Sequence, residues 1–226
     1  MTRSTQPNFD PLARHYRWLE YVTLGPLLER CRQRFLPHLL HHPKALILGD
    51  GDGRFLATLS AHNPALQADA VDTSAAMLHL QRKRSEATAA LTHTRLQTHQ
   101  TDALTFAAQL PKTQTYDLVA THFFLDCLTQ PDLEALITRL TPHLTPGALW
   151  VISDFRIPSG PMRLPALIIV RGLYLAFRII TNLRTTRLPD HHTPLAKSGL
   201  TRIAHHHSLA GLLTTELWQV PANAAK

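Results

Sequence analysis

The stretch KALILGDGDGRFL, residues 44–56, joins a short apolar run to a loop with glycine at every second position. The run KALIL (44–48) predicts a buried strand, and the segment from Arg54 to His62 predicts a helix that ends at Asn63. Glycine lets the backbone turn sharply and approach a ligand closely. In an open α/β sheet, ligands bind beyond the carboxyl ends of the strands. We therefore expect a ligand site at this loop, with a plain strand-to-helix turn as the alternative.

Strand-like and helical segments alternate along the rest of the chain. Helices are expected at 74–90, 104–110 and 132–140, and an antiparallel hairpin at TRIAHHHS (201–208) and LLTTELWQV (212–220). Further strands are expected at LQADAVD (66–72), LQTHQTD (96–102), YDLVATHF (116–123) and ALWVISDF (148–155). Strands separated by helices form right-handed crossovers. The sequence therefore predicts a doubly wound, Rossmann-like α/β fold, whose seven-stranded sheet is mostly parallel, with helices on both faces and an antiparallel C-terminal hairpin.

The composition is that of an ordinary globular protein. Hydrophobic residues make up 44% of the 226 and charged residues 17%, which excludes a disordered or fibrous chain. The net charge of +7 favours anionic surfaces or ligands without choosing among them. Cys31 and Cys127 have no CxxC spacing, and the sequence shows neither a signal peptide nor a run of about 20 apolar residues. We expect a cytoplasmic protein, with peripheral membrane association as an option.

Two acidic residues follow the loop at the ends of the next two expected strands. Asp72 lies 19 residues after Gly53, where a carboxylate can accept two hydrogen bonds from a ribose diol. Asp102 ends the third strand, where it can accept a hydrogen bond from the amine of adenine. Either carboxylate could instead cap the helix that follows it. Together, the loop and the two acids predict a ligand that contains a nucleoside.

The glycine spacing distinguishes between classes of nucleoside ligand. Gly49, Gly51 and Gly53 form GxGxG, which does not complete the GxGxxG fingerprint of dinucleotide-binding proteins. The intervening Asp50 and Asp52 would repel a pyrophosphate, whereas a cationic sulfonium with an amino acid tail suits such a loop. An NAD-dependent oxidoreductase is therefore disfavoured.

Four segments, in order, resemble the successive motifs of class I S-adenosylmethionine-dependent methyltransferases. They are ALILGDGDGRFL (45–56), DAVDTSAAML (69–78), TDAL (101–104) and YDLVATHFFLDCL (116–128), and the resemblance covers about residues 44–155. It implies an enzyme with S-adenosylmethionine as cofactor. The glycines would border its methionine part, Asp72 would hold the ribose, and Asp102 with Ala103 would meet the adenine. The implied cofactor-binding residues are Gly49, Asp50, Gly51, Gly53, Asp72, Thr73, Asp102 and Ala103.

One position departs from this pattern. The family usually has an acid two residues before the first glycine, and Ile47 stands there in this chain. Asp50 or Asp52 could take the place of that acid.

The N-terminal segment FDPLARHYRWLEYVTLG (9–25) resembles the opening of ubiquinone and menaquinone C-methyltransferases, although Arg17 replaces the acid expected after Tyr16. It implies a small hydrophobic acceptor, aromatic or quinone-like. Two alternatives stay open. One is an O- or N-methyltransferase of another natural product, and the other is a catalytically silent cofactor-binding or membrane-associated module.

Candidate catalytic residues lie at the end of the fourth strand and in the N-terminal segment. His122 could deprotonate a phenol or carbon acid at neutral pH, or be a polar residue at a strand end. Asp126 follows it, and Tyr16 could fold over the site as a lid or lie on an exposed helix face. Phe123 and Phe124 are expected to pack rather than to stack on a ligand.

The segment 161–184 predicts a basic amphipathic helix inserted before the hairpin. Arg163, Arg171, Arg178 and Arg184 fall within an arc of roughly 140°, opposite an apolar set that includes Leu167, Leu173 and Phe177. Such a helix covers its own domain or lies on anionic lipid. We expect the apolar face to cover the acceptor pocket and the arginines to face water or lipid.

The chain is thus expected to be one domain with four parts. These are a helical cap (1–43), a cofactor-binding core (44–155), the inserted helical segment (156–190) and the C-terminal hairpin (191–226).

Histidine clusters at 191–192 and 205–207 raise the question of a metal. Neighbouring side chains of a strand point to opposite faces, so only His205 and His207 would share one. We therefore expect no metal site. We also expect no nucleic-acid partner, because the basic residues lack an aromatic platform or a recognition helix. The oligomeric state is left open.

Overall fold

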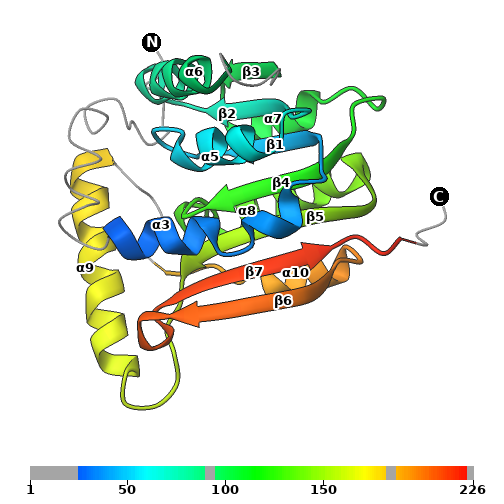
Figure 1. The fold of residues 1–226 in the computed structure, drawn as a ribbon. Helices are drawn as coiled ribbons and strands as arrows, with labels where there is room; N and C mark the ends of the chain where they lie inside the picture. The colour runs from blue at the N-terminus through cyan, green and yellow to red at the C-terminus, as the bar shows by residue number, and fades with distance from the viewer. Residues whose placement is uncertain (1–24, 90–94, 182–186, 223–226) are drawn as a thin grey trace, which may run out of the picture.

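A computed structural model describes residues 25–89, 95–181 and 187–222. Its core is a single sheet of seven strands in the order β3-β2-β1-β4-β5-β7-β6 (Figure 1). The strands β1 to β5 run parallel, and β7 pairs antiparallel with both β5 and β6. The predicted fold class is therefore confirmed. The strands are β1 (Lys44–Leu48), β2 (Gln67–Asp72), β3 (Arg95–Gln100), β4 (Tyr116–His122), β5 (Leu144–Phe155), β6 (Thr201–Ser208) and β7 (Leu213–Gln219).

Helices cover both faces of the sheet because the central strands are apolar on both sides. On one face, Phe55 and Leu59 of α5 pack on Ile47 and Ala120, together with α3 and α4. The helices α7, α8 and α10 lie against the other face, where Trp150 is buried. The helices are α3 (Gly25–Gln33), α4 (Leu36–Leu39), α5 (Arg54–His62), α6 (Ala75–Ala89), α7 (Ala103–Gln109), α8 (Gln130–Leu140), α9 (Arg163–Thr181) and α10 (His192–Lys197).

Two elements differ from the sequence prediction. The strand β5 begins at Leu144 rather than at Ala148, and its pairing with β4 shifts register near Gly147, whose φ is 81°. The short helix α10 was not predicted, because its six residues are too few to show a periodic pattern. It starts where the Asp190 carboxylate accepts hydrogen bonds from the main-chain N–H groups of His192 and Thr193.

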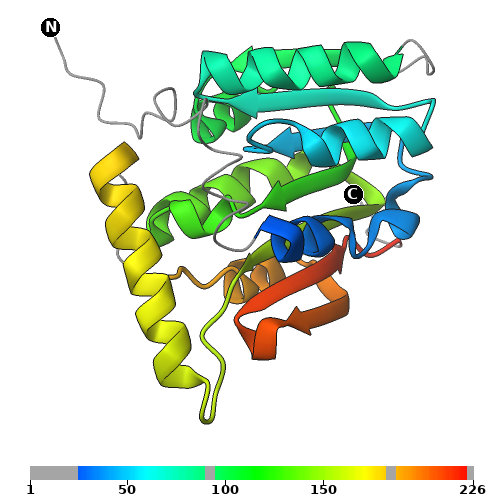
Figure 2. The ribbon, with the colours of Figure 1, turned by 60° about the vertical axis from the view of Figure 1, so that its left-hand side comes forward.

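The helix α9 runs along the carboxyl edge of the sheet (Figures 1 and 2). It docks through Ala166, Val170 and Tyr174, which are spaced by four residues, and the Tyr174 hydroxyl donates to the main-chain carbonyl of Asp126 at 3.0 Å. Leu164 and Ile168 point away from the domain and are 69% and 72% exposed. Arg163 and Arg171 face outward as predicted, and Leu167 and Leu173 are half-buried. The apolar surface of α9 nevertheless extends beyond the side that docks, because Leu164 and Ile168 are exposed. The docked side of α9 contributes the side chains of Ala166 and Val170 and the hydrogen bond of Tyr174. Large apolar side chains remain on its exposed side.

None of the helices in the described ranges, α9 included, is long and apolar enough to cross a bilayer.

Trp150 is the largest fully buried side chain among the described residues, and its indole N–H donates to the Thr121 hydroxyl at 3.0 Å. We expect Trp150→Ala to lower the free energy of unfolding by about 3–5 kcal/mol, because it leaves a cavity between the sheet and α8. Thr121→Val removes only the hydrogen bond and should cost about 1–2 kcal/mol. Denaturant titration followed by circular dichroism measures both, and equal costs would contradict a packing role for the indole.

Candidate cofactor site

The carboxyl ends of the parallel strands meet at one edge of the sheet, to which the arrowhead of β4 points in Figure 1. Main-chain hydrogen bonds join the loops that follow them. The N–H of Gly49 donates to the Val71 carbonyl at 3.1 Å, and the N–H of Thr101 donates to the Asp72 carbonyl at 3.1 Å. The glycine loop, Asp72 and the turn that precedes α7 are therefore neighbours, as the sequence predicted.

The loop requires glycine for two physical reasons. Gly49, Gly51 and Gly53 have φ values of 65°, 57° and 80°, which disfavour other residues. A Cβ on Gly49 would collide with the Phe124 ring, and a Cβ on Gly53 would lie 2.8 Å from Cα of Gln81. The loop is therefore shaped by close packing, and the first turn of α5 begins directly behind it.

Asp50 is the buried carboxylate of this loop. Its Oδ2 accepts a hydrogen bond from the Leu56 N–H at 2.9 Å, whereas Oδ1 is buried without a partner among the described residues. Burial raises the pKa of Asp50 to about 7, against the lowering effects of the Leu56 N–H and of Arg32. A cationic or hydrogen-bond-donating ligand at Oδ1 would compensate this burial.

Asp52, the other candidate for the acid missing at Ile47, is already engaged. It pairs with Arg54 at 2.9 Å and with Arg84 at 2.8 Å. Asp50 is therefore the better substitute for that acid.

Asp72 and Asp102 both act as caps. Oδ1 of Asp72 accepts a hydrogen bond from the Ser74 N–H at 2.9 Å. Oδ1 of Asp102 accepts hydrogen bonds from the N–H groups of Leu104 and Thr105. In each residue the cap uses Oδ1, and a carboxylate can accept several hydrogen bonds at once. The capping alternative and the ligand role are therefore compatible.

The two neighbours of these acids differ in burial. Thr73 is half-buried beside Asp72, and Ala103 is buried in the core at the start of α7. Their contacts with a cofactor stay a prediction.

His122 is the last residue of β4 and is buried. The ring is 3% exposed and contacts Phe55 edge to face, with ring centroids 4.3 Å apart. Nδ1 lies 2.9 Å from the Ser153 hydroxyl, and Nε2 is buried without a partner in the described part of the chain. Burial, with a further contribution from Arg32, holds the pKa of His122 well below its usual value, so the imidazole is neutral.

Asp126 forms a second buried acidic group together with Asp154 at the end of β5. Their side chains share a hydrogen bond, and burial raises the pKa of Asp126 to about 6 and that of Asp154 well above its usual value. Two carboxyl groups this close hold one proton between them. Oδ1 of Asp154 is buried without a partner within the described ranges.

Phe123 and Phe124 follow His122 directly along the chain. Phe123 has a φ of 55°, a strained value for a bulky residue, and its ring lies 5.4 Å from that of Phe155. Strain of this kind concentrates at ligand sites. Phe124 packs against Gly49 and the core, as expected.

The sequence analysis missed Arg32, a buried arginine of α3. Its guanidinium lies 5.4 Å from the centre of the Phe123 ring, and its charge acts on both Asp50 and His122. Nothing in the helical pattern of α3 distinguishes it from a surface arginine. Tyr16, the remaining candidate, lies outside the described residues.

Part of the sequence also matches a known protein family. Residues 46–150 match a family model described as a methyltransferase domain. Such domains take their methyl group from S-adenosylmethionine, and the matched range contains the glycine loop, Asp72, Asp102 and His122. No curated protein matches this sequence.

Solved structures share the fold at low sequence identity. An O-methyltransferase family protein from Burkholderia thailandensis is 16% identical over 98% of this chain and 66% of its own, with a TM-score of 0.70. The N-methyltransferase NodS from Bradyrhizobium japonicum, in complex with S-adenosylhomocysteine, is 16% identical over 86% of this chain and 88% of its own, with a TM-score of 0.58. The mitomycin 7-O-methyltransferase MmcR is 15% identical over 93% of this chain and 58% of its own, with a TM-score of 0.66. This chain is therefore shorter than two of these three proteins.

Because the pKa of Asp50 is raised, we expect ligand binding to be coupled to the loss of a proton from Asp50. Below about pH 7 the free protein keeps Asp50 protonated, which contributes stability that is lost as pH rises from 3.8 to about 7. A ligand ammonium at Oδ1 favours the carboxylate, so binding of S-adenosylhomocysteine at pH 6.5 should release a proton. Calorimetry in two buffers of different ionisation enthalpy measures this release.

The matched variants are Asp50→Asn and Asp117→Asn. Asp117 also has a raised pKa through burial, but it binds the Lys44 N–H at the opposite edge of the sheet. We expect Asp50→Asn to abolish the proton release and Asp117→Asn to leave it unchanged. Equal proton release in the wild type and in Asp50→Asn would remove Asp50 from the site.

Proposed function

We propose that the protein transfers the methyl group of S-adenosylmethionine to a small hydrophobic acceptor with an aromatic or quinone-like ring. One observation carries the proposal. Three of the buried polar atoms that lack a partner in the described ranges, Asp50 Oδ1, His122 Nε2 and Asp154 Oδ1, lie at the carboxyl ends of parallel strands. Asp50 follows β1, His122 is the last residue of β4, and Asp154 is the last but one of β5. Buried polar atoms are nearly always hydrogen-bonded in proteins, so unpaired ones at one edge indicate groups that a ligand completes.

The cofactor is bound at the β1, β2 and β3 side of this edge. Asp50 receives the ammonium of the methionine part, the glycines allow its close approach, and the carboxylate of Asp72 accepts from the ribose. Asp102 and Ala103 meet the adenine. When bound, S-adenosylmethionine supplies the electrophilic methyl group, and the protein's own contribution is to orient it and exclude water.

The acceptor lies beyond β4 and β5, where His122 accepts its proton. The Thr215 hydroxyl donates to the Cys31 carbonyl, so the Ser153 hydroxyl donates to Thr215 and must accept from Nδ1 of His122. This chain of hydroxyls leaves Nε2 as the unprotonated nitrogen. A neutral imidazole with a free Nε2 lone pair is the form that takes a proton from a phenol.

The class of acceptor follows from these groups. A hydroxylated aromatic ring fits the apolar surroundings of Phe123 and Phe155 and gives His122 a proton to remove, which favours O-methylation. The solved relatives include enzymes named as O- and N-methyltransferases, one of them for mitomycin. The quinone-like acceptor rests on the N-terminal segment that resembles quinone C-methyltransferases, and the paired carboxyl groups of Asp126 and Asp154 offer a second proton acceptor.

Cofactor binding is tested most simply at Asp72. We expect Asp72→Ala to weaken S-adenosylhomocysteine binding by about 10- to 100-fold, since hydrogen bonds to a charged group contribute roughly 1.5–3 kcal/mol. Asp117→Ala, which removes a carboxylate from the opposite edge of the sheet, should leave the affinity unchanged. Titration calorimetry measures both, and an unchanged affinity for Asp72→Ala would contradict the proposed ribose contact.

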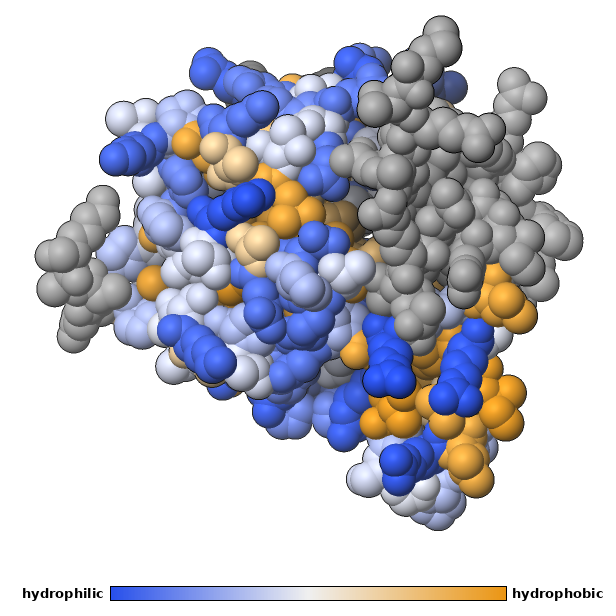
Figure 3. All heavy atoms as spheres, turned by 180° about the vertical axis from the view of Figure 1, so that it is seen from behind, coloured by the Kyte–Doolittle hydropathy of each residue, from blue (hydrophilic) through white to orange (hydrophobic). Residues whose placement is uncertain are grey.

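We also propose that the outer face of α9 contacts an anionic membrane surface, from which an apolar acceptor would be drawn. Leu164, Ile168 and Leu175 form one exposed row, 60–72% accessible, beside the exposed Arg163 and Arg171. Figure 3 shows this apolar patch with hydrophilic side chains lying across it. An apolar row flanked by arginines suits the interface of an anionic bilayer. The net charge of +7 acts in the same direction, and two free cysteines fit the reducing cytoplasmic side.

Vesicle sedimentation tests this contact. Ile168→Glu should lower binding to vesicles that contain phosphatidylserine, and Arg163→Glu with Arg171→Glu should lower it by roughly tenfold or more, at about 1 kcal/mol per basic residue. The matched control is Ile203→Glu, which changes an isoleucine of β6 that is 49% exposed. Wild-type protein that ignores these vesicles at low salt would contradict the proposal.

A further inference from the structure

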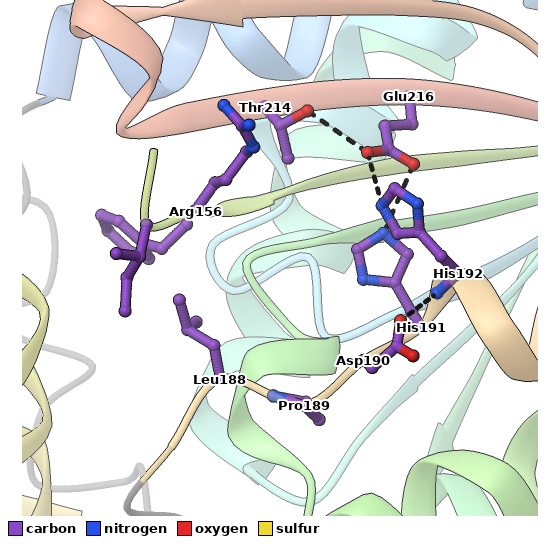
Figure 4. Close-up of a pocket in the computed structure, with 10 residues that line it drawn as sticks. Arg156, Leu188, Pro189, Asp190, His191, His192, Thr214 and Glu216 are labelled. Atoms are coloured by element: carbon purple, nitrogen blue, oxygen red, sulfur yellow. Dashed lines mark hydrogen bonds and ion pairs between the residues drawn. The ribbon is translucent and has the colours of Figure 1, made fainter. Parts of the chain in front are cut away.

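A second polar cluster lies on the β5 and β7 side of the sheet's carboxyl edge, in a pocket of about 230 Å³ between the end of β5, the start of α10 and β7 (Figure 4). His191 and His192, at the start of α10, face Glu216 of β7 across this pocket. Phe155 and Leu188 form part of an apolar wall. None of the pocket residues belongs to the glycine loop or to its acidic partners.

The three side chains converge with the spacing of metal ligands. Nε2 of His191 lies 3.4 Å from Oε2 of Glu216, and Nε2 of His192 lies 3.0 Å from Oε1. One ligand atom from each residue lies within 4.8 Å of the other two. Zinc bonds of about 2.0–2.1 Å in a tetrahedron place neighbouring ligands roughly 3.3 Å apart. The two nitrogen–oxygen distances, each to a different oxygen of Glu216, are close to that value.

The surroundings of Glu216 hold its carboxylate in place without blocking the histidine side. The Trp218 indole N–H donates to Oε2 at 2.9 Å, and the Thr214 hydroxyl donates to Oε1 at 3.4 Å. Hydrogen bonds of this kind orient the carboxylate ligands of metal sites. Glu216 itself is 1% exposed, so its direction is fixed by packing as well.

Arg202 is the competing cation. Its Nη1 lies 3.4 Å from Oε1 of Glu216 and 3.4 Å from Nδ1 of His192. The Arg202 side chain is one-third exposed, so it has room to move outward when a second cation arrives. Without such an ion, Arg202 and the imidazole N–H groups contact this carboxylate in addition to Trp218 and Thr214.

We propose that His191, His192 and Glu216 bind one divalent transition metal ion of the zinc type, with the fourth coordination position left to water in the pocket. Two neutral imidazoles and one carboxylate are a ligand set that such ions prefer. The proposal revises the expectation from the sequence. That expectation weighed the histidines alone, because Glu216 lies 25 residues from His191 along the chain.

The test uses full-length protein without an affinity tag, titrated with zinc chloride by calorimetry and with cobalt chloride by visible absorption. We expect one bound ion per chain and the intense visible bands of four-coordinate cobalt. His192→Ala should weaken binding at least about tenfold, and Glu216→Gln should do the same. His192 is 46% exposed at its side chain, so its variant remains informative even if Glu216→Gln fails to fold.

The matched control is the double variant His205→Ala and His207→Ala, whose rings lie 5.1 Å apart on β6. This variant should bind zinc as the wild type does. The proposal is overturned if zinc shows no saturable binding, if His192→Ala binds it unchanged, or if the β6 variant loses it. The affinity for S-adenosylhomocysteine, measured on the same variants, reports separately on the methyltransferase site.

Discussion

The position of β1 between β2 and β4 is the constraint on which the site depends. Leu48, the last residue of β1, pairs with Val71 on one side and with Thr121 on the other. The residues that follow these three positions are Gly49, Asp72 and His122. A slip of one residue in either pairing would turn each buried side chain to the opposite face and separate these groups. The apolar residues of β1, buried on both faces, hold the register.

The same edge carries a local cost in stability. Burying a polar group without a partner costs about 1–3 kcal/mol, and Asp50, His122 and Asp154 each contain such an atom among the described residues. The same burial disfavours the charged forms of both residues, so it raises the pKa of Asp50 and lowers that of His122. The two core clusters on the faces of the sheet offset the cost. A cofactor and an acceptor that form hydrogen bonds with these atoms would remove this cost, and the gain would contribute to the free energy of binding.

Local patterns predicted most of this arrangement, because they depend on neighbouring residues. The run KALIL, the glycine spacing and the acids at the ends of β2 and β3 are all visible in short windows, and the structure brings them to one edge. The carboxyl ends of parallel strands lie at one edge of the sheet, so residues far apart in the sequence can be predicted to be neighbours without knowledge of side-chain packing.

What the sequence could not show depends on tertiary contacts. Arg32 is an ordinary residue of an amphipathic helix until α3 docks beside Phe123. The helix α9 is apolar over a broad arc, so its pattern could not decide which side docks, and the Tyr174 hydrogen bond to Asp126 decides it. Glu216 meets His191 and His192 only because β7 returns beside β5.

The central claim is that the carboxyl ends of β1 and β2 hold S-adenosylmethionine through Asp50 and Asp72. A crystal structure of the complex with S-adenosylhomocysteine tests it most directly. We expect the ligand amino group within hydrogen-bonding distance of Oδ1 of Asp50, and the ribose hydroxyls on the carboxylate of Asp72. A ligand bound elsewhere, or bound at this edge with neither carboxylate in contact, would contradict it.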